Sequence, residues 1–308
     1  MSTRRVNTAA MRVAALLGAA PGIASHARRC RTPGSIRWVA AAHAQTTEDP
    51  AVPEDLLLRV RERGSHLDRP WSLTYLRNRG KVTRAQKEAW RTLWPQYGID
   101  VQTHAGGGGP PPRLNFREVF ADRPEAPLAL EVGFGLGHSL MEMAAAHPDK
   151  NFVGVEVHKP GIGAALQKIQ ARRDELGDGW VDNVRVVRMD ALWLVRDFIP
   201  RESLSDVCVY FPDPWSDAQA HRRIVNPFLL ALIEPCMAKT GGRLHLSTDD
   251  DSYAEHMFRV MSEAESSGKW EKVDEALLGR SGSTKYEERG RALGSEIRNF
   301  CYRYVGSP

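Results

Sequence analysis

The sequence predicts an α/β fold in which a mostly parallel sheet carries helices on both faces. From about residue 127, short apolar segments rich in β-branched residues alternate with segments of helical periodicity, and this alternation is typical of parallel sheets. The expected strands are 128–134, 151–157, 183–189, 206–211 and 242–248. Because ligands of such folds bind outside the carboxyl ends of the strands, the residues that follow each strand are the first candidates for a site.

Residues 1–50 form an expected leader with a distinctive charge. Its first 47 residues hold seven arginines and no lysine, aspartate or glutamate. Because the whole chain has a net charge of +4, residues 48–308 have a net charge of −3. This composition is typical of an organellar transit peptide, while a secretory signal, a disordered extension and a wrongly assigned start codon are the alternatives. We expect a soluble intracellular protein without a membrane span, in the cytoplasm, or in an organelle if the leader acts as a transit peptide.

The cysteines stand far apart and form no C-x-x-C pair. This spacing argues against a zinc site and against a disulfide framework, so we expect no metal and interpret the cysteines as core residues in a reducing compartment. They are Cys30, Cys208, Cys236 and Cys301.

Residues 51–126 are expected to form a basic helical arm followed by a Gly/Pro linker, and residues 127–308 the main domain. The stretch "TRAQKEAWRTLW" has a threonine cap and apolar residues at helical spacing, and we expect the helix to stop at Pro95. The run "THAGGGGPPPR" predicts the linker. The arginines before the helix are either an RNA-facing arm or an ordinary solvated face.

The first strand of the main domain ends in the glycine-rich stretch "EVGFGLGHS". Gly133, Gly135 and Gly137 allow a sharp turn and a close approach of the backbone to a ligand, next to the acid Glu131. A tight turn without a ligand is the alternative interpretation. The spacing G-x-G-x-G differs from the G-x-G-x-x-G dinucleotide fingerprint, which argues against a nicotinamide oxidoreductase.

Further carboxylates follow the next strands. Glu156 ends the second strand, at a distance from the glycines that suits the two hydroxyls of a ribose, and Asp190 follows the third, where it suits an adenine amino group. Converging acids repel one another, so stability alone does not explain them. S-adenosylmethionine fits them, because it carries a sulfonium, an ammonium, a ribose diol and an exocyclic amine but no pyrophosphate.

The fourth strand ends at "FPDPWSDAQAHRRIV", and here the chain resembles a known family. Together with "LEVGFGLGHSL", "FVGVEVHKPGIGAAL", "STDDDSYAEHM" and "TKYEERGRALG", this motif follows the order and approximate spacing of the bacterial-type tRNA (guanine-N7)-methyltransferases over residues 75–304. The resemblance implies a Rossmann-like class I methyltransferase with a seven-stranded sheet. It also implies S-adenosylmethionine as cofactor, tRNA as partner, and methylation of guanosine N7, expected at position 46 of the variable loop. The sequence leaves monomer and homodimer open.

The resemblance also implies roles for individual residues. Asp213 is expected to be catalytic and, with Glu131, Glu156 and Asp190, to surround the cofactor. The expected substrate-binding residues are Asp249, Thr284, Lys285, Tyr286, Glu287, Arg222 and Arg223. Three alternatives stay open: Asp249 caps the following helix, the stretch "STKYEERG" is a charged surface turn, and Asp213 caps a helix while Trp215 fills the core.

One motif departs from the family pattern. After the tryptophan the family usually carries a longer basic loop, whereas this chain reads "SDAQAHRR" with Asp217 in place of a lysine. Fewer phosphate partners predict weaker RNA binding with a lower salt dependence. The alternative function is therefore a non-catalytic RNA-binding or partner subunit that retains the methyltransferase fold.

Overall fold

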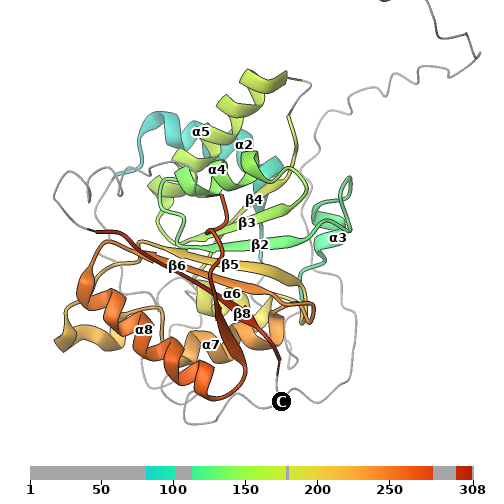
Figure 1. The fold of residues 1–308 in the computed structure, drawn as a ribbon. Helices are drawn as coiled ribbons and strands as arrows, with labels where there is room; N and C mark the ends of the chain where they lie inside the picture. Colours follow the sequence, from blue (N-terminus) through green and yellow to red (C-terminus); the bar gives the residue numbers. More distant parts are fainter. Residues whose placement is uncertain (1–80, 102–112, 178–179, 280–295, 307–308) are drawn as a thin grey trace, which may run out of the picture. The chain divides into compact units, whose positions relative to one another are not determined.

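The computed structural model describes residues 81–101, 113–177, 180–279 and 296–306, so the predicted leader and most of the predicted linker lie outside the described residues. The described residues build an eight-stranded sheet of order β1-β4-β3-β2-β5-β6-β8-β7 (Figure 1). Its strands are β1 (Gly98–Ile99), β2 (Leu128–Val132), β3 (Asn151–Glu156), β4 (Val184–Arg188), β5 (Leu204–Tyr210), β6 (Arg243–Thr248), β7 (Trp270–Val273) and β8 (Arg298–Tyr304).

The sheet confirms the predicted α/β architecture, with one strand more than expected. The five strands from β2 to β6 correspond to the five predicted apolar segments, and neighbours from β4 to β6 pair in parallel. β8 runs antiparallel to both β6 and β7. The eighth strand is β1, whose two residues pair with Val186 and Val187 of β4 at the sheet edge.

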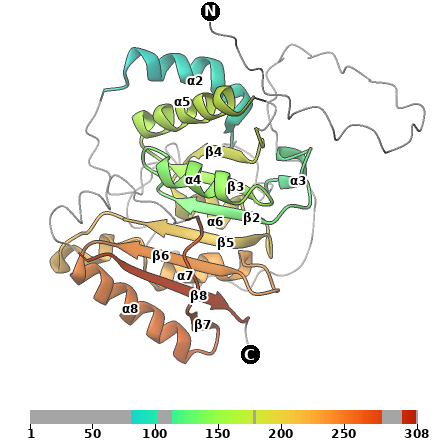
Figure 2. The same ribbon diagram turned by 45° about the horizontal axis from the view of Figure 1, so that its top comes forward.

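Helices cover both faces of the sheet (Figure 2). One face carries α2 (Arg84–Tyr97), α4 (His138–Ala146) and α5 (Lys159–Leu176), and the other carries α6 (Ala191–Asp197), α7 (Pro227–Ile233) and α8 (Asp251–Ser266). The short elements are α3 (Phe116–Val119), η2 (Asp217–Arg222) and η3 (Glu234–Cys236).

A separate apolar cluster fills each side of the sheet. Alternation along β2 sends Leu128, Leu130 and Val132 into the cluster under α6, α7 and α8, and Ala129 into the cluster under α2, α4 and α5. Burying a side chain such as Leu130 contributes about 1.5–3 kcal/mol, so the sheet is held from both faces. Cys208, Cys236 and Cys301 are buried without a disulfide, whereas Cys30 lies outside the described residues.

Helix α2 corrects one detail of the sequence analysis. Thr83 caps it as predicted, and a reciprocal bond from the Thr83 N–H to the Gln86 side chain completes a capping box. Pro95, however, lies inside the helix, which continues to Tyr97. A proline so near the helix end removes only one backbone hydrogen bond there, and burial of Tyr97 in the apolar cluster favours the extra residues.

α2 packs along α5 near the carboxyl end of β3. The Gln86 side chain donates to the Pro160 carbonyl at 3.0 Å, and the Trp90 indole donates to the Lys159 carbonyl at 3.2 Å. Both acceptors lie in the first turn of α5. Within the ranges that the structure describes, every helix is too short or too polar to cross a membrane.

Candidate active site

The predicted acids gather at one edge of the sheet because their strands run parallel. Glu156 is the last residue of β3, Asp190 and Asp213 lie in the segments that follow β4 and β5, and Asp249 directly follows β6. The register of the β3–β4, β2–β3, β2–β5 and β5–β6 pairs aligns these carboxyl ends. The loop after β2 carries the glycines to the same edge.

The glycine loop has the geometry of a ligand cradle. Gly133, Gly135 and Gly137 all adopt positive φ, at 72°, 57° and 74°, which L-residues with a side chain rarely do. A Cβ at Gly133 or Gly135 would meet nothing within 4 Å, so space lies beside both residues. At Gly137 a Cβ would come within 2.7 Å of the Ala165 side chain, so this glycine allows α4 to pack on α5.

Glu156 is bound to the glycine loop through its carboxylate. Its Oε2 accepts from the Gly135 N–H at 3.0 Å, and its Oε1 accepts from the N–H groups of Val157 and His158 at 2.7 and 2.8 Å. Desolvation raises the pKa of Glu156, although these three donors partly oppose the shift. A carboxylate offers about four acceptor sites, so acceptor capacity remains beside these three donors, and the ribose contact stays a prediction.

Glu131 and Asp190 are both buried at this edge of the sheet. Glu131 is 2% exposed and accepts from the Ser139 hydroxyl in the first turn of α4. Asp190 is 3% exposed and caps α6 by accepting from the Leu192 N–H at 2.9 Å. Together with the open side of the glycine loop, these acids fit a ligand that is rich in donors and positive charge, as S-adenosylmethionine is.

Asp213 stands exposed on a constrained turn. Phe211, just after β5, is a non-glycine residue with φ of 48°, a conformation that costs about 1–3 kcal/mol and is common at functional sites. Pro212 and Pro214 fix φ on either side of Asp213, and the Trp215 N–H closes the turn onto the Asp213 carbonyl at 2.9 Å. The Asp213 side chain does not cap η2, whose N-cap residue is Ser216.

Two of the alternatives, Trp215 as a core residue and Asp249 as the cap of α8, can be checked against the side chains around this turn. Trp215 is half-buried rather than a full core residue, and the guanidinium of Arg222 lies over its ring at 4.9 Å. The cap of α8 is Asp250, which accepts from the Tyr253 N–H at 2.7 Å, so the helix does not use Asp249. The Asp249 side chain therefore remains a candidate for binding the substrate at the carboxyl end of β6.

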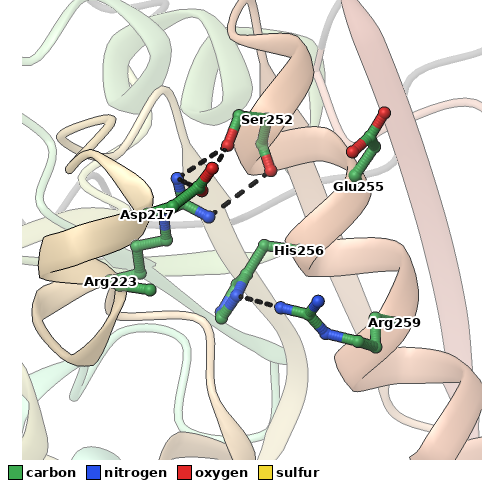
Figure 3. A pocket seen from close by; sticks show the side chains of 7 residues that line it. Asp217, Arg223, Ser252, Glu255, His256 and Arg259 are labelled. Carbon is green, nitrogen blue, oxygen red and sulfur yellow. Dashed lines mark hydrogen bonds and ion pairs between the residues drawn. The ribbon is translucent and has the colours of Figure 1, made fainter.

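Arg223 lies in a different place from the one expected. We predicted that it faces the substrate, but it is 2% exposed and donates to the Trp215 carbonyl, to Ser252 and to Asp217. Hydrogen bonding to the Ser252 hydroxyl, and then to Arg223, lowers the pKa of Asp217. These residues line a pocket of about 210 Å³ between η2 and α8, together with Glu255, His256 and Arg259 (Figure 3).

Four predicted substrate-binding residues lie outside the described residues: Thr284, Lys285, Tyr286 and Glu287.

One contact near the glycine loop was not predicted from the sequence. The contact is made by Gly161 in the first turn of α5, where a Cβ would lie 2.3 Å from the Gly135 carbonyl oxygen. The glycine pair in "PGIG" was visible in the sequence, but its partner across the loop was not. In the described part of the chain, no group of three or more His, Cys, Asp or Glu residues could hold a metal ion.

Comparison with known proteins supports a methyltransferase site at this edge of the sheet. A family model described as "Putative methyltransferase" matches residues 125–300, the segment that contains the glycine loop and all the acids above. The solved 16S rRNA methyltransferase KamB aligns over 62% of this chain and 94% of its own at 16% identity, with a TM-score of 0.42. Fold, site and family model together define a class I methyltransferase.

The curated relatives narrow the class further. The tRNA (guanine-N(7)-)-methyltransferase of Aeromonas hydrophila is 38% identical over 240 residues, which cover 75% of this chain and 92% of that protein. The protein of the same name from Shewanella amazonensis is 39% identical over 237 residues, 75% of this chain and 91% of that protein. The chain belongs to the tRNA (guanine-N(7)-)-methyltransferase family.

Proposed function

We propose that this protein transfers a methyl group from S-adenosylmethionine to N7 of a guanosine in tRNA, at position 46 of the variable loop. The observation that carries the proposal is the set of acids and glycines at the carboxyl edge of the sheet, in a chain of this family. When bound, S-adenosylmethionine supplies an electrophilic methyl group on a sulfonium.

The chemistry needs alignment more than proton transfer. Guanine N7 carries an in-plane lone pair, so no base has to deprotonate it before attack. Holding the nucleophile about 3 Å from the methyl carbon, in line with the leaving sulfur, supplies much of the rate acceleration. Gly133 and Gly135 leave room for the cofactor, and Glu131, Glu156 and Asp190 orient its donors.

Asp213 is the proposed catalytic residue. Positive charge appears on the imidazole part of guanine as the methyl group arrives, and a fixed carboxylate stabilises that charge. The constrained turn between Pro212 and Pro214 holds the Asp213 backbone in place. Trp215, with Arg222 over its ring, offers a face on which a base taken out of the tRNA fold can stack.

The remaining substrate contacts are proposed from the family motifs. Asp249 lies at the same edge, next to α8, and Arg222 is one of the few basic residues left in the shortened loop. The substrate-binding roles of Thr284, Lys285, Tyr286 and Glu287 stay predictions. The domain limits at residues 50 and 126, monomer against homodimer, and the cytoplasm or an organelle as location also stay predictions.

Methyl transfer to tRNA that lacks the modification tests the proposal. Purified protein with labelled S-adenosylmethionine is expected to label guanosine 46, and borohydride reduction followed by aniline cleavage locates the modified base. Asp213→Ala is expected to lower kcat by about 10²–10³-fold, the usual loss for removal of one electrostatic stabiliser. The exposed Asp149→Ala variant serves as the matched control. Absence of methylation on every tRNA, with S-adenosylmethionine binding intact, would overturn the proposal.

A non-catalytic subunit is the weaker alternative. The loss of basic residues from the loop motivates it, but a subunit without activity has no physical need to keep buried acids at one edge. Calorimetry separates the two functions, because a non-catalytic subunit is expected to bind no S-adenosylmethionine.

A further inference from the structure

Arg223 is a buried cation that joins two segments of the proposed site. Its Nε donates to the Trp215 carbonyl at 2.8 Å, two residues after Asp213 in the chain. Its Nη2 donates to the Ser252 hydroxyl at 2.9 Å and its Nη1 to the Ser252 carbonyl at 3.4 Å, at the start of α8. One guanidinium therefore bridges the turn that follows β5 and the helix that follows β6.

Asp217 supplies the counter-charge for this bridge. Its Oδ1 lies 3.0 Å from Arg223 Nη2 and accepts from the Ser252 hydroxyl at 2.7 Å, which closes a triangle of contacts (Figure 3). The Arg223 side chain is 2% exposed and that of Asp217 is 84% exposed. A buried guanidinium without a partner would be costly, so the acid at position 217 has a structural reason to be there.

The Arg223 backbone and the Tyr253 ring next to its guanidinium are also fixed by hydrogen bonds. The guanidinium carbon of Arg223 lies 5.2 Å from the centre of the Tyr253 ring, and the Tyr253 hydroxyl accepts from the Val225 N–H at 3.2 Å. The Asn226 side chain donates to the Arg223 carbonyl at 2.8 Å. A guanidinium has five N–H donors, and the contacts to Trp215, Ser252 and Asp217 use four of them, which leaves little capacity for an RNA phosphate.

We propose that Arg223 is a positioning residue for methyl transfer, which fixes the turn carrying Asp213 to the start of α8, beside Asp249, with Asp217 as its counter-ion. The inference rests on the proposed function, because it assigns Asp213 and Asp249 to the reaction. It also explains the departure from the family motif: the exposed Asp217 is the ion-pair partner of Arg223 and ties the shortened loop to α8. Direct contact with tRNA is left to His221 and Arg222, the last two residues of η2.

Arg223→Lys is the main test. A lysine ammonium on a flexible stem cannot reach the acceptors on Trp215 and Ser252 together, so the turn loosens while the positive charge stays. Since small misplacements of reacting groups cost up to about 10²-fold in rate, kcat is expected to fall by about 10–10²-fold. The KM for tRNA and the Kd for S-adenosylmethionine are expected to change by less than about twofold.

Matched variants separate positioning from RNA binding. Arg259→Lys changes another arginine that lines the same pocket, on α8, and is expected to leave kcat unchanged. Arg222→Lys is expected to show the opposite pattern, a raised KM for tRNA with a smaller effect on kcat. If Arg223→Lys raises KM for tRNA and preserves kcat, then Arg223 contacts RNA and the proposal is wrong.

Hydrogen exchange gives a readout that does not depend on activity. In Arg223→Lys, amides of residues 213–219 are expected to exchange at least several-fold faster, including the Trp215 N–H and the Gln219 N–H that close local turns. Unchanged exchange together with unchanged kcat overturns the proposal. If the wild-type protein methylates no tRNA, the proposed function fails, while exchange still reports whether Arg223 holds the turn.

Milder variants cover the case in which Arg223→Lys does not fold. Ser252→Ala removes the hydroxyl that contacts both charged groups, and Asp217→Asn removes only the counter-charge. Both are expected to lower kcat and accelerate exchange in residues 213–219, less strongly than Arg223→Lys. A folded Ser252→Ala protein with wild-type kcat and exchange would contradict the inference.

Discussion

Glu156 shows how a single side chain serves both the loop and the cofactor. Its carboxylate accepts backbone N–H groups from Gly135, Val157 and His158. In Glu156→Gln an amide N–H₂ faces at least one of these donors, which leaves a hydrogen bond unmade. A loss of about 1–3 kcal/mol in unfolding free energy and about tenfold or more in affinity for S-adenosylmethionine is expected, measured by urea unfolding and calorimetry. Glu175→Gln, on the exposed end of α5, is the control.

The pH dependence of cofactor affinity tests the same residue. Desolvation raises the pKa of Glu156, so protonation begins at a higher pH than for an exposed glutamate. The ionised carboxylate is the stronger acceptor for a ribose hydroxyl. Affinity for S-adenosylmethionine is therefore expected to fall as the pH drops through this raised pKa, and calorimetry in Glu156→Gln should show a flatter profile. Identical profiles for the two proteins would assign the dependence to another group.

The packing of α5 on the glycine loop is a property of two elements rather than of one residue. A Cβ at Gly161 would lie 2.3 Å from the Gly135 carbonyl oxygen, whereas a Cβ at Gly163 would lie 2.8 Å from the Gln86 Cβ of α2. A side chain at position 161 would force the Gly135 backbone to shift, whereas a side chain at position 163 would force the Gln86 side chain of α2 to shift. The two glycines therefore connect α5 to different partners.

Alanine substitutions at these glycines form a matched pair. Gly161→Ala is expected to weaken S-adenosylmethionine binding by about tenfold or more, because it displaces the glycine loop. Gly163→Ala is expected to affect stability more than cofactor affinity, because it separates α2 from α5. Each alanine stabilises helix α5 by about 0.5–1 kcal/mol through its higher helix propensity, and this gain is the same in both variants, so it cancels when they are compared. Calorimetry and thermal unfolding of both variants check this, and equal cofactor affinities would contradict it.

For the molecule as a whole, the sequence predicted the features that depend on short-range pattern. The strands from β2 to β6 were visible because each is a short apolar segment, and the acids were visible because strand ends mark the ligand edge. β1 was not, since two residues carry no periodicity, and Pro95 was misread because burial of Tyr97 outweighs one lost backbone bond.

The remaining differences arise from contacts between distant segments. Arg223 looks like a surface arginine in the sequence, and its burial depends on Ser252, which lies 29 residues away. The bond from the Gly135 N–H to Glu156 depends on how the glycine loop folds over the end of β3, which residue types alone do not specify. Composition identifies which groups a site contains, and tertiary packing decides which of them face the ligand.

A polar network at the opposite end of the strands from the candidate site links much of the sheet. Asp206, near the start of β5, bonds His245 of β6 at 2.9 Å and Lys150, before β3, at 2.6 Å. Burial raises the pKa of the Cys301 thiol on β8 to about 11, so the thiol stays protonated and can donate to His245 Nδ1 at 3.6 Å. That contact favours the tautomer in which His245 Nε2 donates to Asp206.

Loss of this network is expected to lower stability in a pH-dependent way. Burial opposes ionisation of Asp206, but bonds from His245 and Lys150 overcome it and hold its pKa well below the usual range. Because the folded-state pKa lies far below the unfolded value near about 4, the ionised carboxylate contributes stability that is fully present at neutral pH. This contribution is lost progressively as the pH falls from the unfolded value through the lowered folded-state pKa. Asp206→Asn is expected to cost about 3–5 kcal/mol at neutral pH, because the buried His245 and the partly buried Lys150 lose their charged partner. Urea unfolding from pH 7.5 to about 3 should show the difference from wild type shrinking once the pH is below about 4, with Asp149→Asn unchanged throughout; a difference that stays constant down to about pH 3 would show that Asp206 acts by packing alone.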